Sequence, residues 1–296
     1  MNIKTGFAAL MAALLLLPGL AKADEQPMET EAPFELTSPS AILCEASTGR
    51  VIFEKNADER RPVASVNKVM TILLTLEAID EGRASQEDRV TISTRAASMG
   101  GSQAFLDAGE SYKLGELLKT VIVASANDSA VALAEYLAGS EEGFVKQMNA
   151  RAEELGLENT HYVNCTGLPA QNHYTTARDV AKLSAQLDLH PLYYKYSTIW
   201  MDEIRHRGGR VTSLTNTNRL IRFYPGCDGY KTGSTNEARY CVSATAKKDG
   251  MRLIAVVLGT PAGQTRFDEA RAMLEYGFAN VQLVTPIAQG QALDMT

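Results

Sequence analysis

The sequence predicts an α+β fold in which strands from the two ends of the chain form one antiparallel sheet, flanked by helices and carrying an inserted helical lobe. Three observations favour it: β-rich runs lie within residues 40–54, helical patterns fill most of 113–190, and β-rich runs return within 238–260. Strands at both ends and helices between them close one unit when distant segments pair. The length of 296 residues allows a core that needs neither disulfides nor a structural metal.

The first 36 residues are expected to lie outside this unit. An almost unbroken apolar run from Phe7 to Leu20 follows a short positive start, and Ala21-Lys22-Ala23 has the form of a signal-peptidase site. The alternative, an uncleaved anchor, is disfavoured because the run is shorter than the roughly 20 residues that span a bilayer. We therefore expect a signal peptide over 1–23, a flexible leader over 24–36, and an exported mature chain without a membrane span.

The folded unit is expected to begin with a hairpin and a long helix. Two β-rich runs, 40–45 and 50–54, flank a turn-like Ala46-Ser47-Thr48-Gly49. A helix follows between Pro62 and Gly82, and it is apolar nearly all round. A helix without a polar face belongs in the interior, so we expect this one to run through the centre of the unit.

The remaining elements are predicted from hydrophobic periodicity with Gly and Asn punctuation. They comprise four helices, a hairpin with a Gly-ended turn and a final amphipathic helix, at residues 113–124, 127–138, 141–155, 176–187, 238–245 with 251–260, and 264–278. The folded unit is thus predicted to span residues 37–280, followed by a tail at 281–296.

Composition excludes several classes of function. The net charge of -6 opposes phosphate contacts, so we expect no nucleic-acid partner. The four cysteines have no C-x-x-C spacing, and those in apolar strand-like runs, Cys44 and Cys241, are expected to be buried. The four histidines show no metal-binding spacing. We therefore predict neither a metal nor another cofactor.

Ser65-Val66-Asn67-Lys68 opens the predicted central helix and places a serine and a lysine one turn apart on the same face. Burial disfavours an ammonium ion, so Lys68 could be neutral enough to take a proton from Ser65. The ordinary interpretation of the same pattern is a helix-capping serine and a solvated lysine.

Two further segments carry polar groups suited to a peptide-like ligand. Ser125-Ala126-Asn127 lies between two predicted helices, where it could relay a proton and bind an amide, or merely cap a helix. Lys231-Thr232-Gly233 leads from a turn into a strand, and it is either a surface turn or a cation beside the nucleophile. In the second case, Gly233 would let a substrate backbone approach the strand edge.

In the order S-x-x-K, S-x-N, K-T-G, the three segments form the signature of penicillin-binding proteins and class A β-lactamases. The chain resembles the D-alanyl-D-alanine carboxypeptidase family, the low-molecular-mass penicillin-binding proteins, and closely the type of spore-forming Gram-positive bacteria. The likeness runs from about Pro39 to Ala279 and includes further segments: Thr48-Gly49-Arg50, Lys55-Asn56-Ala57, Thr166-Gly167-Leu168-Pro169, His173-Tyr174-Thr175-Thr176-Ala177 and Asp249-Gly250-Met251-Arg252-Leu253.

The resemblance implies a β-lactamase/transpeptidase-like fold and removal of the terminal D-alanine from peptidoglycan pentapeptide stems, with β-lactams as covalent inhibitors. Ser65 would be the nucleophile and Lys68 its base. Ser125 and Lys231 would return the proton to the leaving amine, and Asn127 would hold the substrate amide.

The same resemblance assigns the groups around the substrate's carbonyl and its end. The backbone N–H groups of Ser65 and Ser234 would hold the oxyanion. The terminal carboxylate would bind Arg266, with Thr232 and Thr235 as hydroxyl partners and Gly233 beside them. The ordinary interpretation of Arg266 is a surface residue in the first turn of the last helix.

The chain departs from the family pattern at several places. Asn67 stands where the family usually has Thr, and Ser234 follows Lys-Thr-Gly where some relatives have His or a larger residue. Residues 281–296 are expected to be a tail, and a possible stub of the β-rich second domain that relatives commonly carry. Three alternatives remain: a class A-like β-lactamase with Glu158 activating water, a DD-endopeptidase, and a non-catalytic cell-wall binding module.

Overall fold

The computed structural model describes residues 34–283, so the expected signal peptide lies outside the described residues, as do most of the leader and most of the tail. The packed part of the chain already includes Phe34, whose ring meets Phe53 and Tyr276 edge-on at 5.2 and 5.5 Å between centroids. Lys55 Nζ donates a hydrogen bond of 2.7 Å to the carbonyl of Leu36. Within residues 34–283, no helix combines the length and hydropathy that a bilayer crossing needs.

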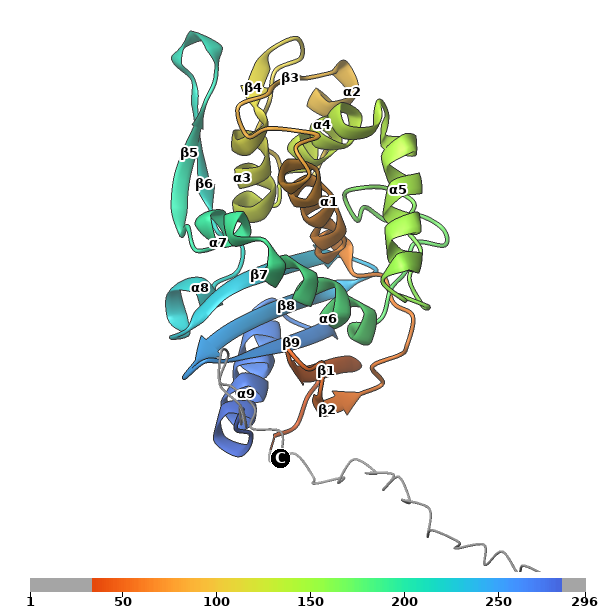
Figure 1. Cartoon of the computed structure of the whole chain (residues 1–296), viewed down its shortest axis with the longest axis vertical. Helices are drawn as coiled ribbons and strands as arrows, with labels where there is room; N and C mark the ends of the chain where they lie inside the picture. The colour runs from red at the N-terminus through yellow and green to blue at the C-terminus, as the bar shows by residue number, and fades with distance from the viewer. Residues whose placement is uncertain (1–33, 284–296) are drawn as a thin grey trace, which may run out of the picture. The chain divides into compact units, whose positions relative to one another are not determined.

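A five-stranded antiparallel sheet joins the two ends of the described chain (Figure 1). Its strand order is β2-β1-β9-β8-β7, and each neighbouring pair is antiparallel. The predicted α+β architecture, with N- and C-terminal strands in one sheet, is therefore confirmed. The strands are β1 (Ser40–Glu45), β2 (Val51–Lys55), β7 (Cys227–Thr235), β8 (Arg239–Lys248) and β9 (Met251–Thr260).

The two faces of the sheet belong to two different cores. Because side chains alternate along a strand, Leu253, Ala255 and Val257 of β9 face one way and the residues between them face the other. The first face packs against α9 (Thr265–Asn280). The second face packs against the helical lobe, with α6 (Ala177–Gln186) directly over the strands (Figure 1).

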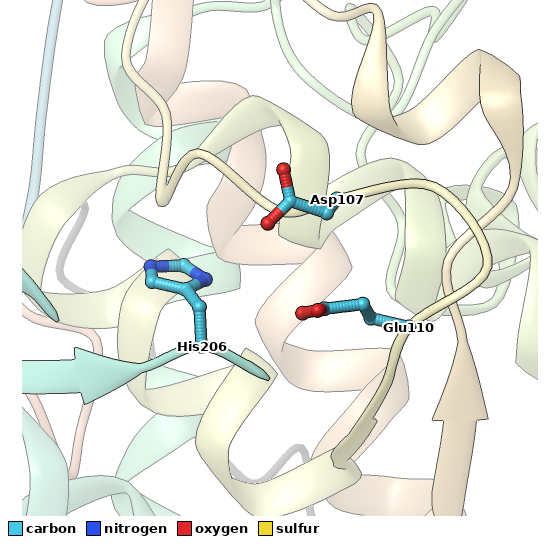
Figure 2. Close-up of side chains that lie close together, drawn as sticks. All are labelled: Asp107, Glu110 and His206. Carbon is cyan, nitrogen blue, oxygen red and sulfur yellow. The ribbon is translucent and has the colours of Figure 1, made fainter. Parts of the chain in front are cut away.

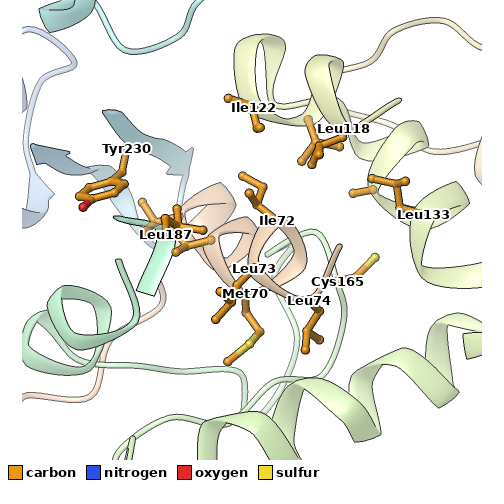
Figure 3. Packing of buried hydrophobic residues seen from close by; sticks show 14 of the residues in the cluster. Met70, Ile72, Leu73, Leu74, Leu118, Ile122, Leu133, Cys165, Leu187 and Tyr230 are labelled. Atoms are coloured by element: carbon orange, nitrogen blue, oxygen red, sulfur yellow. The ribbon is translucent and has the colours of Figure 1, made fainter. Parts of the chain in front are cut away.

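The predicted central helix is buried on every side. It begins as a 3-10 turn, η1 (Ala64–Asn67), and continues as α1 (Lys68–Asp80). Each residue from Lys68 to Leu76 is buried. Figure 3 shows its side chains radiating toward Leu118, Leu133 and Tyr230, which come from three different parts of the chain. The helix ends just before Gly82, which adopts a φ of 71°. A glycine at this position is typical of helix ends, and it predicted this end from the sequence.

The helices that surround α1 agree with the predicted ranges to within one or two residues. Helices α5 and α6 begin at capping side chains. The hydroxyl of Ser140 accepts a hydrogen bond from Gly143 N, and the hydroxyl of Thr176 accepts one from Asp179 N. The predicted helices, besides α6, are α3 (Leu114–Ala124), α4 (Asn127–Ala138) and α5 (Glu141–Glu154). Four short helices were not predicted: α2 (Thr94–Ala97), η2 (Leu187–Leu189), α7 (Pro191–Ser197) and α8 (Leu220–Phe223).

Two hairpins were not predicted from the sequence. Their strands are short and bury few side chains, such as Val90, Ile204 and Leu214, so hydrophobic alternation is too weak to indicate them. The hairpins are β3 (Arg89–Thr91) with β4 (Ser111–Lys113), and β5 (Met201–Arg205) with β6 (Val211–Thr215), the latter joined through η3 (Arg207–Gly209).

All four cysteines carry free, buried thiols. The predicted burial of Cys44 and Cys241 is thus confirmed. Burial raises the pKa of the Cys44 thiol to about 12 and that of Cys241 to about 11, so neither is a reactive thiolate at neutral pH.

Candidate active site

Ser65 and Lys68 lie at the junction of η1 and α1, and their side chains meet. Lys68 Nζ is 2.8 Å from Ser65 Oγ and donates a second hydrogen bond of 2.7 Å to the carbonyl of Thr166. Lys68 is fully buried, and this desolvation lowers its pKa from 10.5 to about 7. At neutral pH a substantial fraction of Lys68 is therefore the free amine, which can accept a proton.

The backbone turn that presents Ser65 is packed tightly between two glycines. A Cβ on Gly233 would lie 2.4 Å from the carbonyl oxygen of Val63 and 2.8 Å from the backbone nitrogen of Ser65. A Cβ on Gly167 would lie 2.0 Å from the carbonyl oxygen of Ala64, whose own φ is 49°. Gly233 was expected to make room for a substrate backbone. The structure shows that the chain's own backbone already requires this glycine.

Ser125 ends α3 in the left-handed region, with φ 63° and ψ 30°. A non-glycine residue in this region carries local strain, which clusters at functional sites. Its hydroxyl is buried and has no hydrogen-bond partner among residues 34–283. Asn127 Nδ2 donates to the carbonyl of Gly100 at 2.7 Å, while Asn127 Oδ1 is buried and lacks a partner in the same part of the chain. The capping interpretation of Asn127 is wrong, because no side chain caps the start of α4.

Lys231 lies in β7, at the edge of the sheet, and is almost fully buried. Its Nζ donates to the carbonyl of Thr232 at 3.0 Å. Burial and then the positive charges of Lys68 and Arg266 lower the pKa of Lys231 well below its usual value. The surface-lysine interpretation is therefore wrong. These surroundings disfavour the charged form of Lys231 relative to an exposed lysine.

The Thr232 hydroxyl is hydrogen-bonded to Thr217, a residue that the sequence analysis did not identify. Thr232 Oγ1 donates to Thr217 Oγ1 at 2.8 Å, and Thr217 N donates to the carbonyl of Val123 at 3.1 Å. Thr217 thus connects β7 to the last turn of α3, just before Ser125. A threonine in a polar loop gives no sequence signal for this position.

Arg266, in the first turn of α9, is half-buried and reaches across to the sheet. Its Nη1 donates to the carbonyls of Gly233, at 2.8 Å, and Cys241, at 3.2 Å. Its Nε is buried without a partner among the described residues. Nearby on β7, Ser234 is exposed, and Thr235 Oγ1 accepts a hydrogen bond of 3.0 Å from Ala238 N. Arg266 is therefore not a free surface residue.

Buried side-chain atoms without partners are concentrated at these positions. Buried polar atoms are normally hydrogen-bonded, so each exception requires an explanation. Three of the six in residues 34–283 belong to predicted site residues, as a site that binds a polar ligand would require. The six are Ser38 Oγ, Ser40 Oγ, Ser125 Oγ, Asn127 Oδ1, His173 Nδ1 and Arg266 Nε.

Metal-ligating side chains also gather away from this site, beside the β5/β6 hairpin (Figure 2). The ligand atoms of Asp107, Glu110 and His206 lie within 4.8 Å of one another. Each already has a protein partner, since Asp107 pairs with Arg210 and the Tyr112 hydroxyl meets both Glu110, at 2.5 Å, and His206 Nδ1, at 2.7 Å. The other ring nitrogen of His206 meets a hydroxyl of β6 at 2.9 Å. A hydrogen-bonded network of the protein itself accounts for this cluster.

The fold and the Ser65–Lys68 pair define a class, the serine acyl-transfer hydrolases in which a lysine serves as base. The chain superposes on the D-alanyl-D-alanine carboxypeptidase DacD of Francisella tularensis with a TM-score of 0.80 and 31% identity, covering 86% of this chain and 72% of that one. The model of the D-alanyl-D-alanine carboxypeptidase family matches residues 26–262. The chain belongs to this family, which confirms the predicted family, fold and enzyme class.

Two further relatives support the assignment. D-alanyl-D-alanine carboxypeptidase DacF of Bacillus subtilis is 46% identical over 243 residues, covering 82% of this chain and 62% of the relative. DacC of Escherichia coli is 37% identical over 293 residues, covering 97% of this chain and 72% of the relative. The likeness to the type of spore-forming Gram-positive bacteria is confirmed, and the chain spans less than two thirds of the length of the B. subtilis relative.

Proposed function

We propose that this chain removes the terminal D-alanine from peptidoglycan pentapeptide stems through an acyl-enzyme on Ser65. The contact between Ser65 Oγ and the buried Lys68 Nζ, 2.8 Å apart, carries the proposal. A serine hydroxyl is a weak nucleophile by itself, and a neutral amine within hydrogen-bond reach activates it. The three relatives described above are named D-alanyl-D-alanine carboxypeptidases, and these names support the substrate class.

In the proposed acylation, Ser65 Oγ forms a bond to the carbonyl carbon of the penultimate D-Ala while its proton moves to Lys68. The backbone N–H groups of Ser65 and Ser234 hold the oxyanion. The C–N bond then breaks, and the departing amine receives a proton through Ser125 and Lys231. Water subsequently attacks the ester and releases the shortened peptide, which restores the Ser65 hydroxyl.

The substrate's end is proposed to bind along β7. Asn127, with Oδ1 unpartnered and Nδ2 already bonded to Gly100, presents an acceptor to the substrate's amide N–H. Arg266, supported by the hydroxyls of Thr232 and Thr235, binds the terminal carboxylate. That carboxylate would bring a negative charge toward Lys231 and favour its protonated form. A protonated Lys231 could then donate to the Ser125 hydroxyl and help Ser125 pass the Ser65 proton from Lys68 to the leaving amine.

We infer that the mature chain works outside the cytoplasmic membrane, on the cell-wall side, or in the periplasm if the cell is Gram-negative. The apolar run and the Ala21-Lys22-Ala23 site support export. The substrate, a wall polymer, lies on the same side. β-Lactams are expected to acylate Ser65 because they present a strained amide to the same groups.

Mass spectrometry after brief exposure to penicillin tests the nucleophile and the class together. We expect an adduct of the drug's mass on the peptide that contains Ser65, and none on the Ser65→Ala variant. An adduct elsewhere, or no adduct on a folded wild type, would overturn the proposal. Rapid turnover of penicillin without a lasting adduct would instead favour a class A-like β-lactamase.

Release of D-alanine from diacetyl-Lys-D-Ala-D-Ala tests the reaction itself. The purified mature chain should release D-alanine, whereas a cell-wall binding module would retain the peptide and release none. Rates on crosslinked and uncrosslinked muropeptides separate a carboxypeptidase from an endopeptidase. A higher rate on the crosslinked material would contradict the carboxypeptidase assignment.

A further inference from the structure

The carbonyl that holds Lys68 belongs to a turn built by the side chain of Asn164. Asn164 Oδ1 accepts hydrogen bonds from Thr166 N at 3.1 Å, from Thr166 Oγ1 at 3.0 Å and from Gly167 N at 2.7 Å. Its Nδ2 donates to the carbonyl of Leu168 at 2.9 Å. The peptide groups of residues 164–168 are therefore fixed relative to one another, including the Thr166 carbonyl.

Asn67 attaches this turn to the helix that carries the reacting groups. Asn67 is buried, and its Nδ2 donates to the carbonyl of Asn164 at 3.2 Å. Its Oδ1 lies 2.7 Å from His173 Nε2. Because the amide nitrogen of Asn67 faces a carbonyl, its oxygen faces the ring, and His173 Nε2 carries the proton and donates it. Both polar ends of Asn67 are thus held by the segment between residues 164 and 173.

The orientation of an amine decides whether it can act as a base. A neutral lysine has two N–H bonds and one lone pair, and it rotates freely about its last carbon–nitrogen bond unless an N–H is held. The Thr166 carbonyl accepts one N–H of Lys68. Ser65 Oγ lies on another side of the same nitrogen. Holding the N–H at Thr166 therefore leaves the lone pair able to point at the Ser65 hydroxyl.

We propose that Asn67 and His173 are positioning residues for acylation, which fix the Thr166 carbonyl against Lys68 and so direct the Lys68 lone pair at Ser65. The inference rests on the proposed function. Asn67 joins the helix to the turn directly, and His173 fixes the orientation of the Asn67 amide. A threonine carries its donor and its acceptor on one oxygen of a shorter side chain, so it does not reproduce the two separate ends of the Asn67 amide that make this connection.

The test compares variants that break the connection with one that removes an equivalent set of bonds at a residue without a hydrogen bond to Asn67, to His173 or to the turn at 164–168. Asn67→Leu and His173→Leu remove the bond between the two side chains. His173→Gln keeps a donor near the position of Nε2. Asn149→Leu is the matched control, because Asn149 also spans two segments, with bonds of 3.0 Å to the carbonyl of Val145 and 2.9 Å to the carbonyl of Tyr162. The measurement is the acylation rate constant with penicillin across pH, beside the melting temperature.

Both leucine variants should acylate roughly tenfold to a hundredfold more slowly than the wild type, since small misplacement of a catalytic group has effects of this size. Their rise of rate with pH should also move to lower pH, because a loosened Thr166 carbonyl stabilises the ammonium form of Lys68 less. His173→Gln should recover to within about threefold of the wild type. The double variant, Asn67→Leu with His173→Leu, should acylate at a rate within about threefold of that of Asn67→Leu alone. Residues that act through the same series of contacts lose little more when both are removed.

Asn149→Leu should lower the melting temperature without moving the pH profile. The inference fails if folded Asn67→Leu and His173→Leu acylate as the wild type does, or if their loss matches that of Asn149→Leu at every pH. Asn67→Leu could fold poorly because it empties a buried site, in which case the half-exposed His173→Leu decides. A wild type without a penicillin adduct on Ser65 would refute the proposed function, whereas a reactive wild type with equally reactive variants would refute only this inference.

Discussion

At the scale of single residues, the proposed chemistry depends on Lys68 being buried without a carboxylate partner among residues 34–283. Lys68 touches a hydroxyl and a carbonyl, and neither compensates for the loss of water around an ammonium ion. Desolvation therefore lowers its pKa to about 7. By contrast, the buried Lys119 keeps a carboxylate of Asp202 at 2.8 Å, and its pKa is raised. The partner, as well as burial, decides whether a lysine can serve as a base.

The first prediction is a dependence of acylation on the charge of Lys68. The rate constant for acylation by penicillin should rise about tenfold per pH unit below pH 7 and level off above it, because only the neutral amine can take the Ser65 proton. Stopped-flow measurement of adduct formation between pH 5 and 9 provides the profile. A rate that stays flat over this range would exclude Lys68 as the base.

The second prediction concerns Arg266 and the substrate's terminal carboxylate. Arg266→Leu should lower kcat/KM for diacetyl-Lys-D-Ala-D-Ala by roughly a hundredfold, because it leaves the carboxylate without its cation. The same peptide with an amidated end should react slowly with the wild type and lose less than about threefold in the variant. Equal losses on both peptides would show that Arg266 acts only through its bonds to the carbonyls of Gly233 and Cys241.

At the scale of elements, the site is a junction of three backbone segments. The edge strand β7, the turn η1 and the loop at 164–167 approach so closely that a Cβ on Gly233 or Gly167 would overlap the backbone of η1. Such packing is dense and yields little to added atoms. The position of Ser65 is therefore set by neighbours on both sides of it.

The third prediction separates this crowding from ordinary glycine strain. Gly167 and Gly250 both have φ 82°, but a Cβ on Gly250 would have nothing within 4 Å, whereas on Gly167 it would meet Ala64 O at 2.0 Å. Gly250→Ala should cost about 1 kcal/mol of unfolding free energy. Gly167→Ala should cost about 1–3 kcal/mol more and also slow acylation, because Ala64 must move.

Urea unfolding and penicillin acylation of both variants provide the comparison. Gly250→Ala should keep the wild-type acylation rate, since its turn lies between β8 and β9. If the two variants were equally stable and equally reactive, the close contact between the loop and η1 would not matter for the site.

At the scale of the whole molecule, the active site reduces the stability of the fold. Two lysines, Lys68 and Lys231, are buried in the described part of the chain with lowered pKa values. In the unfolded chain Lys68 titrates near 10.5, so between pH 7 and 10.5 the unfolded state binds more protons than the folded one. The unfolding free energy therefore rises with pH across this range, and the full cost of burying Lys68 applies below pH 7.

The fourth prediction is that Lys68→Met stabilises the protein while abolishing acylation. Replacing Lys68 removes the free-energy cost of burying its ammonium form, which is about 5 kcal/mol at most. The lost hydrogen bonds to Ser65 and Thr166 offset about half of it. We expect a net gain of about 2 kcal/mol at pH 6 that shrinks toward pH 10, measured by urea unfolding. A variant less stable than the wild type at pH 6 would show that the lysine's contacts outweigh its desolvation.

Much of the fold could be predicted because its signals are local. The hairpin at 40–55, the central helix and the helices of the lobe follow from periodicity and from Gly, Ser and Thr at their ends. The β3/β4 and β5/β6 hairpins could not, because their short strands rely on tertiary contacts more than on pattern. The same division applies to the site. Side chains in motifs were identified, whereas the Thr166 carbonyl and the Thr217 hydroxyl were not.

The order of residues along the chain establishes which reactive groups exist. It also places Ser65 and Lys68 on one helix face, because a spacing of three residues is about one helical turn. The lowered pKa that the proposed base needs came from the fold. The pKa of Lys68 depends on the water removed from around it and on a carbonyl supplied 98 residues further along the chain. Desolvation is a property of the assembled surroundings, and no residue carries it alone.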